Sequence, residues 1–345
     1  MEQSVFEKLP GAILPWYQAQ KRDLPWRADR EPYHIWLSEI MLQQTRVEAV
    51  KDYYIRFLQA LPTIADLAQC DDEVLNKLWE GLGYYSRVRN LKKAAQEIVR
   101  SYGGKFPETY EQVLALPGIG PYTAGAICSI AFDQNTPAVD GNVLRLITRL
   151  TADFTPIDSH GFKERVAQAL QSIYPKEAGS FTQGLMELGA TVCGPNRKPD
   201  CENCPCQEFC RGYEKGVAEQ LPVKSPKKNR RVEEKTVFIL SCGGKVALCK
   251  RPESGLLAGL WQFPDIPGEL ELPQIFAVVE EMGLIPKNIY RQVERTHIFT
   301  HIEWHMRGFY LEVEEPAGPF TWITGETLKK EAALPTAYRQ FWEEM

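Results

Sequence analysis

The sequence lacks the features of a membrane or secreted protein. It has no run of about 18 apolar residues, so no membrane-spanning helix is predicted. Residues 1–4 contain neither the basic segment nor the apolar core that begins a secretory signal. We therefore expect an intracellular protein with no membrane partner. In a reducing compartment, its nine cysteines are not expected to form a disulfide framework.

An excess of positive charge is also missing. The net charge of -5 does not by itself suggest a nucleic-acid-binding protein. The acidic excess is confined to residues 232–345, which carry 11 Lys and Arg against 17 Asp and Glu, whereas residues 1–231 carry 29 against 28. A nearly neutral domain can still bind DNA through one local basic face.

The length of 345 residues predicts about two domains. Residues 1–220 are predicted to be helical, because apolar residues recur at three- and four-residue spacing, clearest in 33–59 and 71–102. Residues 221–231 are rich in Pro, Lys and Arg and are predicted to be a linker. Residues 232–345 have strand patterns and one helical pattern, which predicts a smaller α+β domain.

Local signals place several element boundaries. Asp72 and Thr109 are predicted helix N-caps, and Gly103-Gly104 a helix end. In the C-terminal part, strands are predicted at 236–240, 245–249 and 304–311, a turn at 242–244, and a helix at 273–282.

Residues 116–122, Leu-Pro-Gly-Ile-Gly-Pro-Tyr, are the most informative stretch of the chain. Gly118 and Gly120 allow a tight hairpin with positive φ, and Pro121 suits the first turn of the next helix. The free N–H groups of such a hairpin can hold a DNA phosphate without reading sequence. Asp140 follows about twenty residues later and is expected to bring a carboxylate close to that phosphate. The structural alternative is an ordinary helical corner with a buried or capping Asp.

Four cysteines fall within eighteen residues: Cys193, Cys201, Cys204 and Cys210. Four thiolates on a compact loop fit a [4Fe–4S] cluster, and tetrahedral zinc is the alternative. No His lies nearby and only one Cys-x2-Cys pair is present, which favours the cluster. Cys206, inside the same loop, is a spare ligand or a free thiol. Basic residues around the loop could also contact phosphate: Arg197, Lys198 and Arg211.

Taken together, these residues resemble the MutY family of adenine-DNA glycosylases, in the helix-hairpin-helix superfamily related to endonuclease III. The resemblance covers most of residues 15–215. It depends on 38–45 (Ser-Glu-Ile-Met-Leu-Gln-Gln-Thr), 81–87 (Gly-Leu-Gly-Tyr-Tyr-Ser-Arg), the hairpin, 139–142 (Val-Asp-Gly-Asn) and the four cysteines. It implies an all-α catalytic domain with a [4Fe–4S] cluster in residues 1–220.

The C-terminal part, residues 232–345, resembles the Nudix-like domain of the same family more loosely. The match depends on 255–264 (Gly-Leu-Leu-Ala-Gly-Leu-Trp-Gln-Phe-Pro) and on Phe299-Thr300-His301. Only 279–283 remain of the Nudix magnesium-binding helix, so nucleotide hydrolysis is not expected. Two positions depart from the family pattern. The spacing from Cys193 to Cys201 is one residue longer, and Thr300 replaces the usual Ser.

The resemblance implies a chemistry of adenine excision. Glu39 lies in a strongly apolar helical segment, where burial would raise its pKa and keep it protonated to act on adenine N7. Asp140, ionised, would stabilise or trap the oxocarbenium ion. Tyr122 would hydrogen-bond to Asp140 and position it. Asn142 would orient the nucleophile or the carboxylate, or cap the next helix. Since a phenol cannot form a Schiff base, Tyr122 predicts a monofunctional glycosylase.

The remaining expected site residues would contact DNA. The target adenine must leave the base stack, and Gln44 and Tyr84 match family residues that wedge into the duplex. Arg27 and Gln183 match positions of the adenine pocket, with salt-bridge or surface roles as alternatives. The resemblance also implies that the loop at 299–301 inspects the opposite base, 8-oxoguanine in the family; a plain β-hairpin is the alternative. Leu116, Gly118 and Gly120 would hold the backbone.

Two other functions stay open from the sequence: a sister glycosylase for mismatched thymine or an oxidised pyrimidine, and a non-catalytic mismatch-binding protein. The expected partner is double-stranded DNA with adenine opposite 8-oxoguanine or guanine. The protein is expected to be a monomer in a bacterial cytoplasm, associated with the nucleoid. The basic segment 224–231 is a candidate docking site for other repair proteins.

Overall fold

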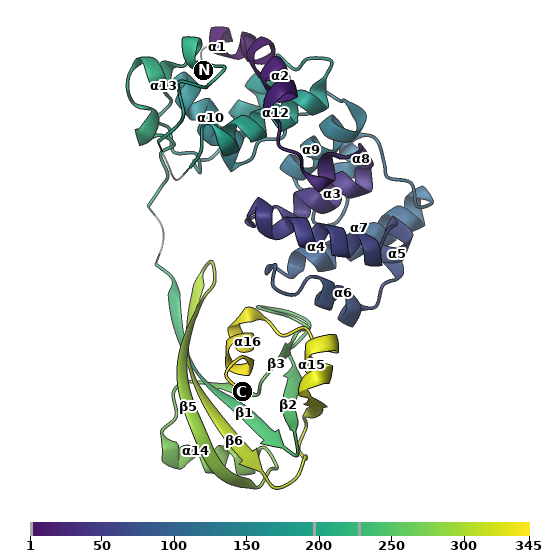
Figure 1. Ribbon diagram of the computed structural model, residues 1–345, viewed down its shortest axis with the longest axis vertical. Helices are drawn as coiled ribbons and strands as arrows, with labels where there is room; N and C mark the ends of the chain where they lie inside the picture. Colours follow the sequence, from purple (N-terminus) through teal and green to yellow (C-terminus); the bar gives the residue numbers. More distant parts are fainter. Residues whose placement is uncertain (1–2, 196–197, 227–228) are drawn as a thin grey trace. The chain divides into compact units, whose positions relative to one another are not determined.

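The structure, a computed structural model, describes residues 3–195, 198–226 and 229–345 (Figure 1). The chain forms two compact units, Met1–Gln69 with Arg89–Pro226, and Cys70–Val88 with Lys227–Met345. The sequence places residues 70–88 in the first domain, whereas the structure groups them with the second unit. No helix in the described ranges combines the length and the apolar character needed to cross a membrane.

The first unit is built from helices, and its described residues contain no β-strand. Its α-helices are α1 (Gln3–Glu7), α2 (Leu9–Gln20), α3 (Pro32–Met41), α4 (Val47–Ala60), α5 (Ile64–Gln69), most of α7 (Ser86–Tyr102), α8 (Tyr110–Leu114), α9 (Pro121–Phe132), α10 (Gly141–Thr151), α11 (Phe162–Gln171), α12 (Ala178–Thr191) and α13 (Arg211–Glu214). Short 3-10 turns are η1 (Pro25–Arg27), η2 (Gln207–Phe209) and η3 (Ala218–Gln220). The predicted all-helical domain is confirmed.

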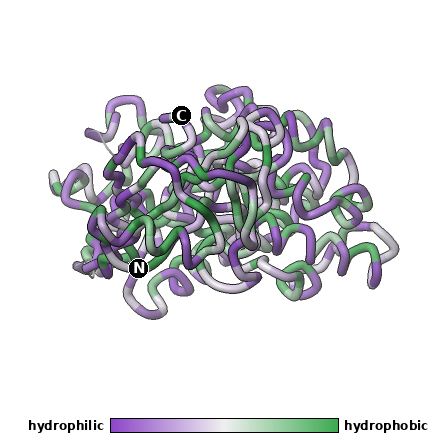
Figure 2. Tube along the Cα trace, turned by 90° about the horizontal axis from the view of Figure 1, so that it is seen from below, coloured by the Kyte–Doolittle hydropathy of each residue, from purple (hydrophilic) through white to green (hydrophobic). Residues whose placement is uncertain are grey.

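Amphipathic spacing determines how these helices pack. Hydrophobic and hydrophilic residues alternate at short intervals along the chain trace (Figure 2), as expected when each helix buries one face. One core cluster is formed by side chains of α1, α2, α10, α11 and α12. The helix α9 differs, because eight of its residues, 123–130, are all buried. It therefore packs in the interior of the unit and contacts both α3 and α12.

Close packing between α10 and α12 brings two parts of the site together. A Cβ at Gly189, in α12, would lie 2.7 Å from the carbonyl oxygen of Asn142, in α10. A distance below 3.0 Å is too short for a real Cβ, so only glycine allows this approach. The backbone that carries Asn142 therefore lies directly against α12.

The second unit contains a mixed sheet with strand order β3-β2-β1-β6-β5, in which β4 also pairs with β1 and β7 with β2. The central pair, β1 and β6, is parallel, and the other pairs are antiparallel. The strands are β1 (Arg231–Cys242), β2 (Lys245–Lys250), β3 (Trp261–Gln262), β4 (Asp265–Pro267), β5 (Pro286–Ile298), β6 (Ile302–Val313) and β7 (Thr321–Thr324). The helices are α6 (Asp72–Leu78), α14 (Leu272–Glu281), α15 (Gly325–Glu331) and α16 (Thr336–Trp342).

Helices cover both faces of this sheet (Figure 1). Alternate side chains of β1 point to opposite faces, as expected for a strand. Val237 and Ile239 join the core cluster that includes residues of α15 and α16. Phe238 and Leu240 join the cluster that includes residues of α14. The predicted α+β domain is therefore confirmed, with a strand that is buried on both sides.

The predicted local signals are mostly confirmed. Thr109 caps α8 by accepting a hydrogen bond from the N–H of Gln112, at 3.4 Å. The glycines at 103 and 104 have positive φ and follow the end of α7. The prediction for Asp72 is wrong by one residue, because the side chain that caps α6 belongs to Asp71, which accepts from the N–H of Glu73 at 2.8 Å. Both Asp residues are acceptable caps, so the sequence alone could not separate them.

Part of the predicted linker is fixed to the first unit. The N–H of Ile157 donates to the carbonyl of Val223 at 3.0 Å, and Arg149 Nε donates to the carbonyl of Leu221 at 3.0 Å. Ser225 donates to Asp158 through both its N–H and its hydroxyl, each at 3.0 Å. Residues 227 and 228 of this segment lie outside the described residues.

Candidate active site

The predicted hairpin joins α8 to α9. Gly118 has φ +76, and a Cβ there would lie 2.5 Å from the Asn90 side chain, so this position requires glycine. Gly120, at φ -102, ends the hairpin as the N-cap residue of α9, and its carbonyl accepts from the N–H of Ala124 at 2.9 Å. Leu116 is buried, and its carbonyl accepts from the N–H of Ile119 at 3.2 Å within the turn.

Glu39 is a buried acid at the centre of the site. It lies on α3 with 7% of its surface exposed and accepts a hydrogen bond from the hydroxyl of Tyr122, on α9. Burial raises the pKa of Glu39 to about 7, and the Asp140 charge raises it too, while the Tyr122 hydrogen bond and the Arg27 charge lower it. The raised pKa expected from the apolar segment is therefore confirmed.

The prediction that Tyr122 hydrogen-bonds to Asp140 is wrong, because the partner of Tyr122 is Glu39. The Tyr122 hydroxyl donates to Glu39, because α3 packs against α9 and brings the two side chains together. Burial and the charges of both carboxyl groups raise the pKa of Tyr122 well above its usual value. The raised pKa keeps the Tyr122 hydroxyl protonated, so that it can donate to Glu39.

Asp140 is held by α10 and by Asn142. It is the N-cap residue of α10, and its Oδ1 accepts from the N–H of Val143 at 2.8 Å, while its Oδ2 accepts from Asn142 Nδ2 at 2.6 Å. Arg145 Nη2 in turn donates to Asn142 Oδ1 at 2.8 Å. Burial raises the pKa of Asp140, and these hydrogen bonds with the Arg145 charge oppose the rise. Of the roles considered for Asn142, the geometry supports orientation of the carboxylate.

A pocket of ≈ 170 Å³ collects these groups. Its lining includes Glu39, Tyr122, Asp140 and Asn142. The two residues expected in a base pocket line it as well, namely Arg27 and Gln183. The pocket therefore presents one carboxyl group with a pKa near neutrality and a second one held by hydrogen bonds that favour its charged form.

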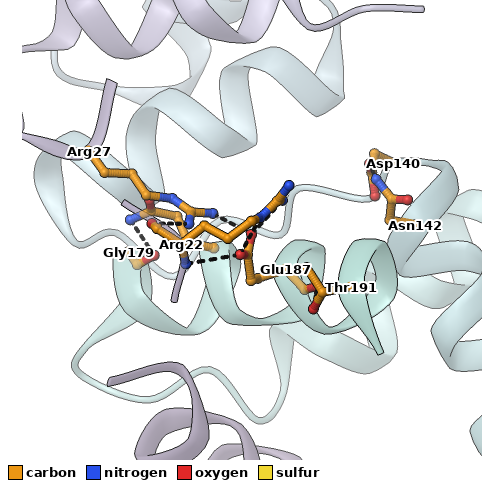
Figure 3. A network of polar contacts seen from close by, with 8 residues as sticks. Arg22, Arg27, Asp140, Asn142, Gly179, Glu187 and Thr191 are labelled. Atoms are coloured by element: carbon orange, nitrogen blue, oxygen red, sulfur yellow. Dashed lines mark hydrogen bonds and ion pairs between the residues drawn. The ribbon is translucent and has the colours of Figure 1, made fainter. Parts of the chain in front are cut away.

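Sequence reasoning missed a buried ionic cluster in the same pocket. Glu187, on α12, is 1% exposed and binds Arg22 Nε at 2.7 Å and Arg27 Nη2 at 2.8 Å (Figure 3). Burial alone would raise the pKa of Glu187, but hydrogen bonds and charges from the two arginines bring it down to about 2. The available signal was that Glu187 is the only charged residue in the sequence of α12. Arg27 lines this pocket and also forms a salt bridge, the alternative considered for it, whereas its role in binding adenine stays a prediction.

The two expected DNA wedges are exposed and conformationally unusual. Gln44, just after α3, has φ +58. Tyr84, in the second unit, has φ +49 and is 45% exposed. Residues other than glycine rarely adopt this left-handed backbone conformation, and such backbone strain is concentrated at functional sites.

The expected lesion loop is the tip of the hairpin between β5 and β6. Thr300 and His301 are exposed. Phe299 instead packs inward, with its ring centroid 4.6 Å from that of His297 and 4.8 Å from that of Trp304. Phe299 is therefore placed to anchor the loop, whereas its two neighbours face outward.

The four cysteines of the loop lie around one cavity, which Cys193, Cys201, Cys204 and Cys210 all line. The Cys206 side chain is fully buried and is not part of that lining. Among the basic residues expected nearby, Lys198 is exposed and Arg211 pairs with Glu214, while Arg197 lies outside the described residues.

Sequence reasoning also missed Arg149 beside this cavity. It is 4% exposed and donates to the carbonyls of Cys193 and Gly194 at 3.0 and 3.2 Å, and to Cys193 Sγ at 3.3 Å. A buried guanidinium aimed at a thiol favours negative charge on the sulfur. Burial raises the pKa of the Cys193 thiol, and the hydrogen bond and charge of Arg149 oppose that rise.

Comparisons with known proteins agree with this arrangement. Residues 37–175 match the family model of the HhH-GPD superfamily base excision DNA repair protein, and residues 236–344 match that of the NUDIX domain. The chain is 38% identical to the adenine DNA glycosylase of Mus musculus, over 95% of this chain and 76% of that protein. It is 33% identical to the adenine DNA glycosylase of Buchnera aphidicola subsp. Acyrthosiphon pisum, over 89% of this chain and 86% of that protein.

Solved structures share the fold of the helical unit. A thermostable thymine-DNA glycosylase aligns with a TM-score of 0.56 and 29% identity, covering 61% of this chain and 98% of that one. An endonuclease III–DNA covalent intermediate aligns with a TM-score of 0.53 and 24% identity, covering 63% of this chain and 99% of that one. Because the similarity to adenine DNA glycosylases extends over nearly the whole chain, including both units, this protein belongs to the adenine DNA glycosylase family and is a DNA glycosylase of base excision repair.

Proposed function

We propose that this protein is a monofunctional glycosylase that removes adenine paired with 8-oxoguanine or guanine and leaves an abasic site. The observation that carries the proposal is the pairing of Glu39 and Asp140 in one pocket. Breaking the bond between adenine and deoxyribose needs an acid at the base and a negative charge at the sugar, as two-carboxylate glycosidases provide.

Glu39 is suited to be the acid. With a pKa of about 7, a large fraction of the group is protonated at neutral pH and can donate to adenine N7. The Tyr122 hydroxyl donates a hydrogen bond to Glu39 Oε2, which fixes the carboxyl orientation and leaves the other oxygen for the base. Tyr122 occupies the hairpin position and carries no amine, which supports a reaction without a Schiff base.

Asp140 is suited to stabilise the positive charge that develops on the sugar. Its carboxylate is fixed by Asn142 and by the start of α10, so it needs little rearrangement during the reaction. Arg145 Nη2 in turn donates a hydrogen bond to Asn142 Oδ1 at 2.8 Å. In this assignment Asp140 stabilises or traps the oxocarbenium ion, while Asn142 and Arg145 position it.

Two further residues that line the pocket are suited to bind the flipped base. Gln183 offers an amide and Arg27 a guanidinium that Glu187 holds in place. Both side chains can hydrogen-bond to the edge of a purine, which is how flipped bases are read. Gln44 and Tyr84 would fill the gap left in the duplex, and the outward-facing Thr300 and His301 would contact the base opposite.

We also propose that the four cysteines hold a [4Fe–4S] cluster. One zinc ion would require all four sulfurs within about 2.3 Å of a single point. Zinc sites usually have two Cys-x2-Cys pairs or one pair with histidines, whereas this loop has the single pair Cys201 and Cys204 and no His nearby. Thiolates spread around a shared cavity suit the larger cluster, which would tie the loop to α10 through Arg149.

A single-turnover assay tests the adenine activity. The wild-type protein is incubated with a duplex containing adenine opposite 8-oxoguanine, and with one containing thymine opposite guanine, each followed by alkali. Adenine release alone supports the proposal. Thymine release alone would favour the second candidate, which rests on the structural likeness to the thymine-DNA glycosylase.

The variant Asp140→Asn separates an enzyme from a mismatch-binding protein. Asn is also a good helix N-cap, so α10 should still form. We expect base release to fall by at least about 100-fold while affinity for the duplex is kept. Equal loss of affinity and turnover would argue against the assigned role.

A further inference from the structure

Lys163, in the first turn of α11, lies beside the pocket that holds Glu39 and Asp140. Its ammonium nitrogen is 5.7 Å from the centre of the Tyr122 ring, and Tyr122 lines this pocket together with Asp140. An aromatic face attracts a cation at this distance. Partial burial lowers the pKa of Lys163, and the charges of Asp140 and Glu164 oppose that fall. The ammonium group is therefore close enough to Asp140 for the two charges to interact.

The helix that carries Lys163 is fixed in the core, whereas the lysine itself remains accessible. Phe162 and Val166 are fully buried and belong to the core cluster that includes residues of α10. Lys163 lies between them in sequence and is exposed. The N–H of Arg165 donates to the carbonyl of Gly161 at 3.1 Å, within the first turn of the helix. A fixed helix thus presents an accessible cation beside the pocket.

Lys163 differs in its pairing from the other cations of the pocket. The two arginines that line the pocket, Arg22 and Arg27, both form ion pairs with Glu187. Lys163, by contrast, forms no ion pair with any residue that the structure describes. An anion from outside the protein can therefore bind Lys163 without breaking an existing ion pair.

DNA brings such an anion next to Asp140. A duplex carries one negative charge for about every 1.7 Å of its axis. The proposed chemistry needs the charged form of Asp140 beside the sugar of the target nucleotide, where it would repel the phosphates attached to that sugar. A cation close to the carboxylate lowers this repulsion.

We propose that Lys163 binds one of the two phosphates that flank the target nucleotide, so that the sugar is held against Asp140. The inference rests on the proposed function, because it takes Asp140 as the group beside the sugar. The hairpin ends at Gly120, two residues before Tyr122, and is expected to hold DNA through backbone N–H groups. Lys163 adds a full positive charge beside the same helix start.

The first test removes the charge of Lys163 and measures how binding depends on salt. Lys163→Met keeps an unbranched side chain beside Tyr122 without the charge, and Lys163→Arg keeps the charge. Arg165→Met is the matched control, because Arg165 is an exposed cation on the same helix and residues two positions apart do not share a helix face. The probe is a duplex with a non-cleavable adenine nucleotide opposite 8-oxoguanine. Its dissociation constant is measured between about 50 and 200 mM salt.

We expect Lys163→Met to weaken binding by about 3- to 10-fold at about 0.1 M salt. The slope of log Kd against log salt should fall by about 1, because one phosphate contact is lost. Lys163→Arg and Arg165→Met should keep the wild-type affinity and slope. No change in Lys163→Met, or an equal change in Arg165→Met, would overturn the proposal. Equal Tm values for all variants exclude a general loss of structure.

A second probe locates the contact on the DNA. Each of the two flanking phosphates is replaced in turn by an uncharged methylphosphonate. On one of these duplexes Lys163→Met should bind as tightly as wild type, because the charge that Lys163 contacts is already absent. A loss of affinity that persists on both duplexes would overturn the proposal. No base is released in these measurements, so failure of the proposed function is seen separately, as a wild-type protein that does not release adenine from a cleavable duplex.

Discussion

At the scale of single residues, the proposed chemistry depends on how the protein keeps a carboxylic acid protonated near neutral pH. Glu39 lies on α3 with 7% exposure, and taking its charged form out of water is the largest influence on its pKa. The Asp140 charge in the same pocket opposes a second negative charge. Tyr122 and Arg27 limit the shift, so the pKa stays near 7 instead of rising further. A group poised there can give its proton at physiological pH.

We predict that base release depends on the proton of Glu39. The rate constant should be highest below about pH 7 and should fall about tenfold per pH unit above it, as the acid form is lost. Glu39→Gln should be slower by about 100-fold or more and should lose this dependence, because an amide cannot donate a comparable proton. Single-turnover rates between pH 5.5 and 9 measure both effects. A rate constant for Glu39→Gln within about tenfold of the wild-type value would argue against the role of Glu39 as the acid.

The same pKa predicts an effect on stability. Glu39 has a folded pKa of about 7 against an ordinary value of 4.5, so between these values the folded state binds more protons than the unfolded state. The free energy of unfolding therefore falls as pH rises through this window, by about 3 kcal/mol in all. Glu39→Gln removes this loss. We therefore expect the Tm of Glu39→Gln minus the Tm of wild type to be larger at pH 8 than at pH 5. The same Tm difference at both pH values would contradict the raised pKa of Glu39.

Single residues also show where sequence reasoning reached its limit. Burial of Glu39 could be predicted because its neighbours in the chain are apolar. The partner of Tyr122 could not, because it depends on how α3 packs against α9. Glu187 was detectable as one charge in an apolar helix, but its two arginine partners are about 160 residues away in sequence.

At the scale of elements, the hairpin between α8 and α9 shows how glycine has two different roles. Gly118 is required by its positive φ and by Asn90, whereas a Cβ at Gly120 would meet nothing within 4 Å. The sequence predicted one hairpin from both glycines, and the structure shows that only Gly118 needs the left-handed backbone. This distinction provides a variant and its control in the same turn.

We predict that Gly118→Ala destabilises the hairpin and Gly120→Ala does not. A left-handed non-glycine residue costs roughly 1–2 kcal/mol, which lowers the Tm by about 2–8 °C in a domain of this size. The affinity for a DNA duplex should fall with it, because the hairpin N–H groups would no longer be aligned. Thermal unfolding and binding titrations measure the two effects. Similar losses in both variants would show that the hairpin geometry is not what matters.

The cysteine loop gives a second prediction at this scale. The purified protein should absorb at about 400 nm and contain about four iron atoms per chain. Cys204→Ser removes a thiolate from the cavity lining and should lower the iron content, whereas Cys206→Ser should not, because Cys206 is not part of that lining. Measuring the iron and zinc content per chain of the wild type, Cys204→Ser and Cys206→Ser distinguishes the cluster from a zinc site. One zinc per chain, lost in Cys204→Ser, would favour the alternative metal.

Element boundaries were otherwise well marked in the sequence. Turn and cap residues act locally, which is why Thr109 and the glycines at 103 and 104 were predicted correctly. The mixed order of the sheet was not predictable, because the parallel pairing of β1 with β6 joins segments about 70 residues apart. Docking of α6 onto the C-terminal domain depends on similar long-range contacts through Glu73 and Glu80.

At the scale of the whole molecule, chemistry and lesion recognition are assigned to different units. The pocket with its two carboxyl groups belongs to the first unit, and the hairpin tip at 300–301 belongs to the second. The acidic excess of residues 232–345 suits a unit that contacts DNA at few points, while the balanced first unit provides the hairpin that we expect to bind phosphate. Since adenine is a normal base, the proposed function requires that selectivity come from the base opposite it.

The most direct test compares single-turnover base release from three duplexes that differ only in the base opposite adenine. We predict fast release opposite 8-oxoguanine, slower release opposite guanine, and none opposite thymine, because only the first two are the proposed mispairs. Equal rates on all three would contradict the assignment of lesion recognition to the second unit. No release from any of them would contradict the adenine chemistry assigned to Glu39 and Asp140.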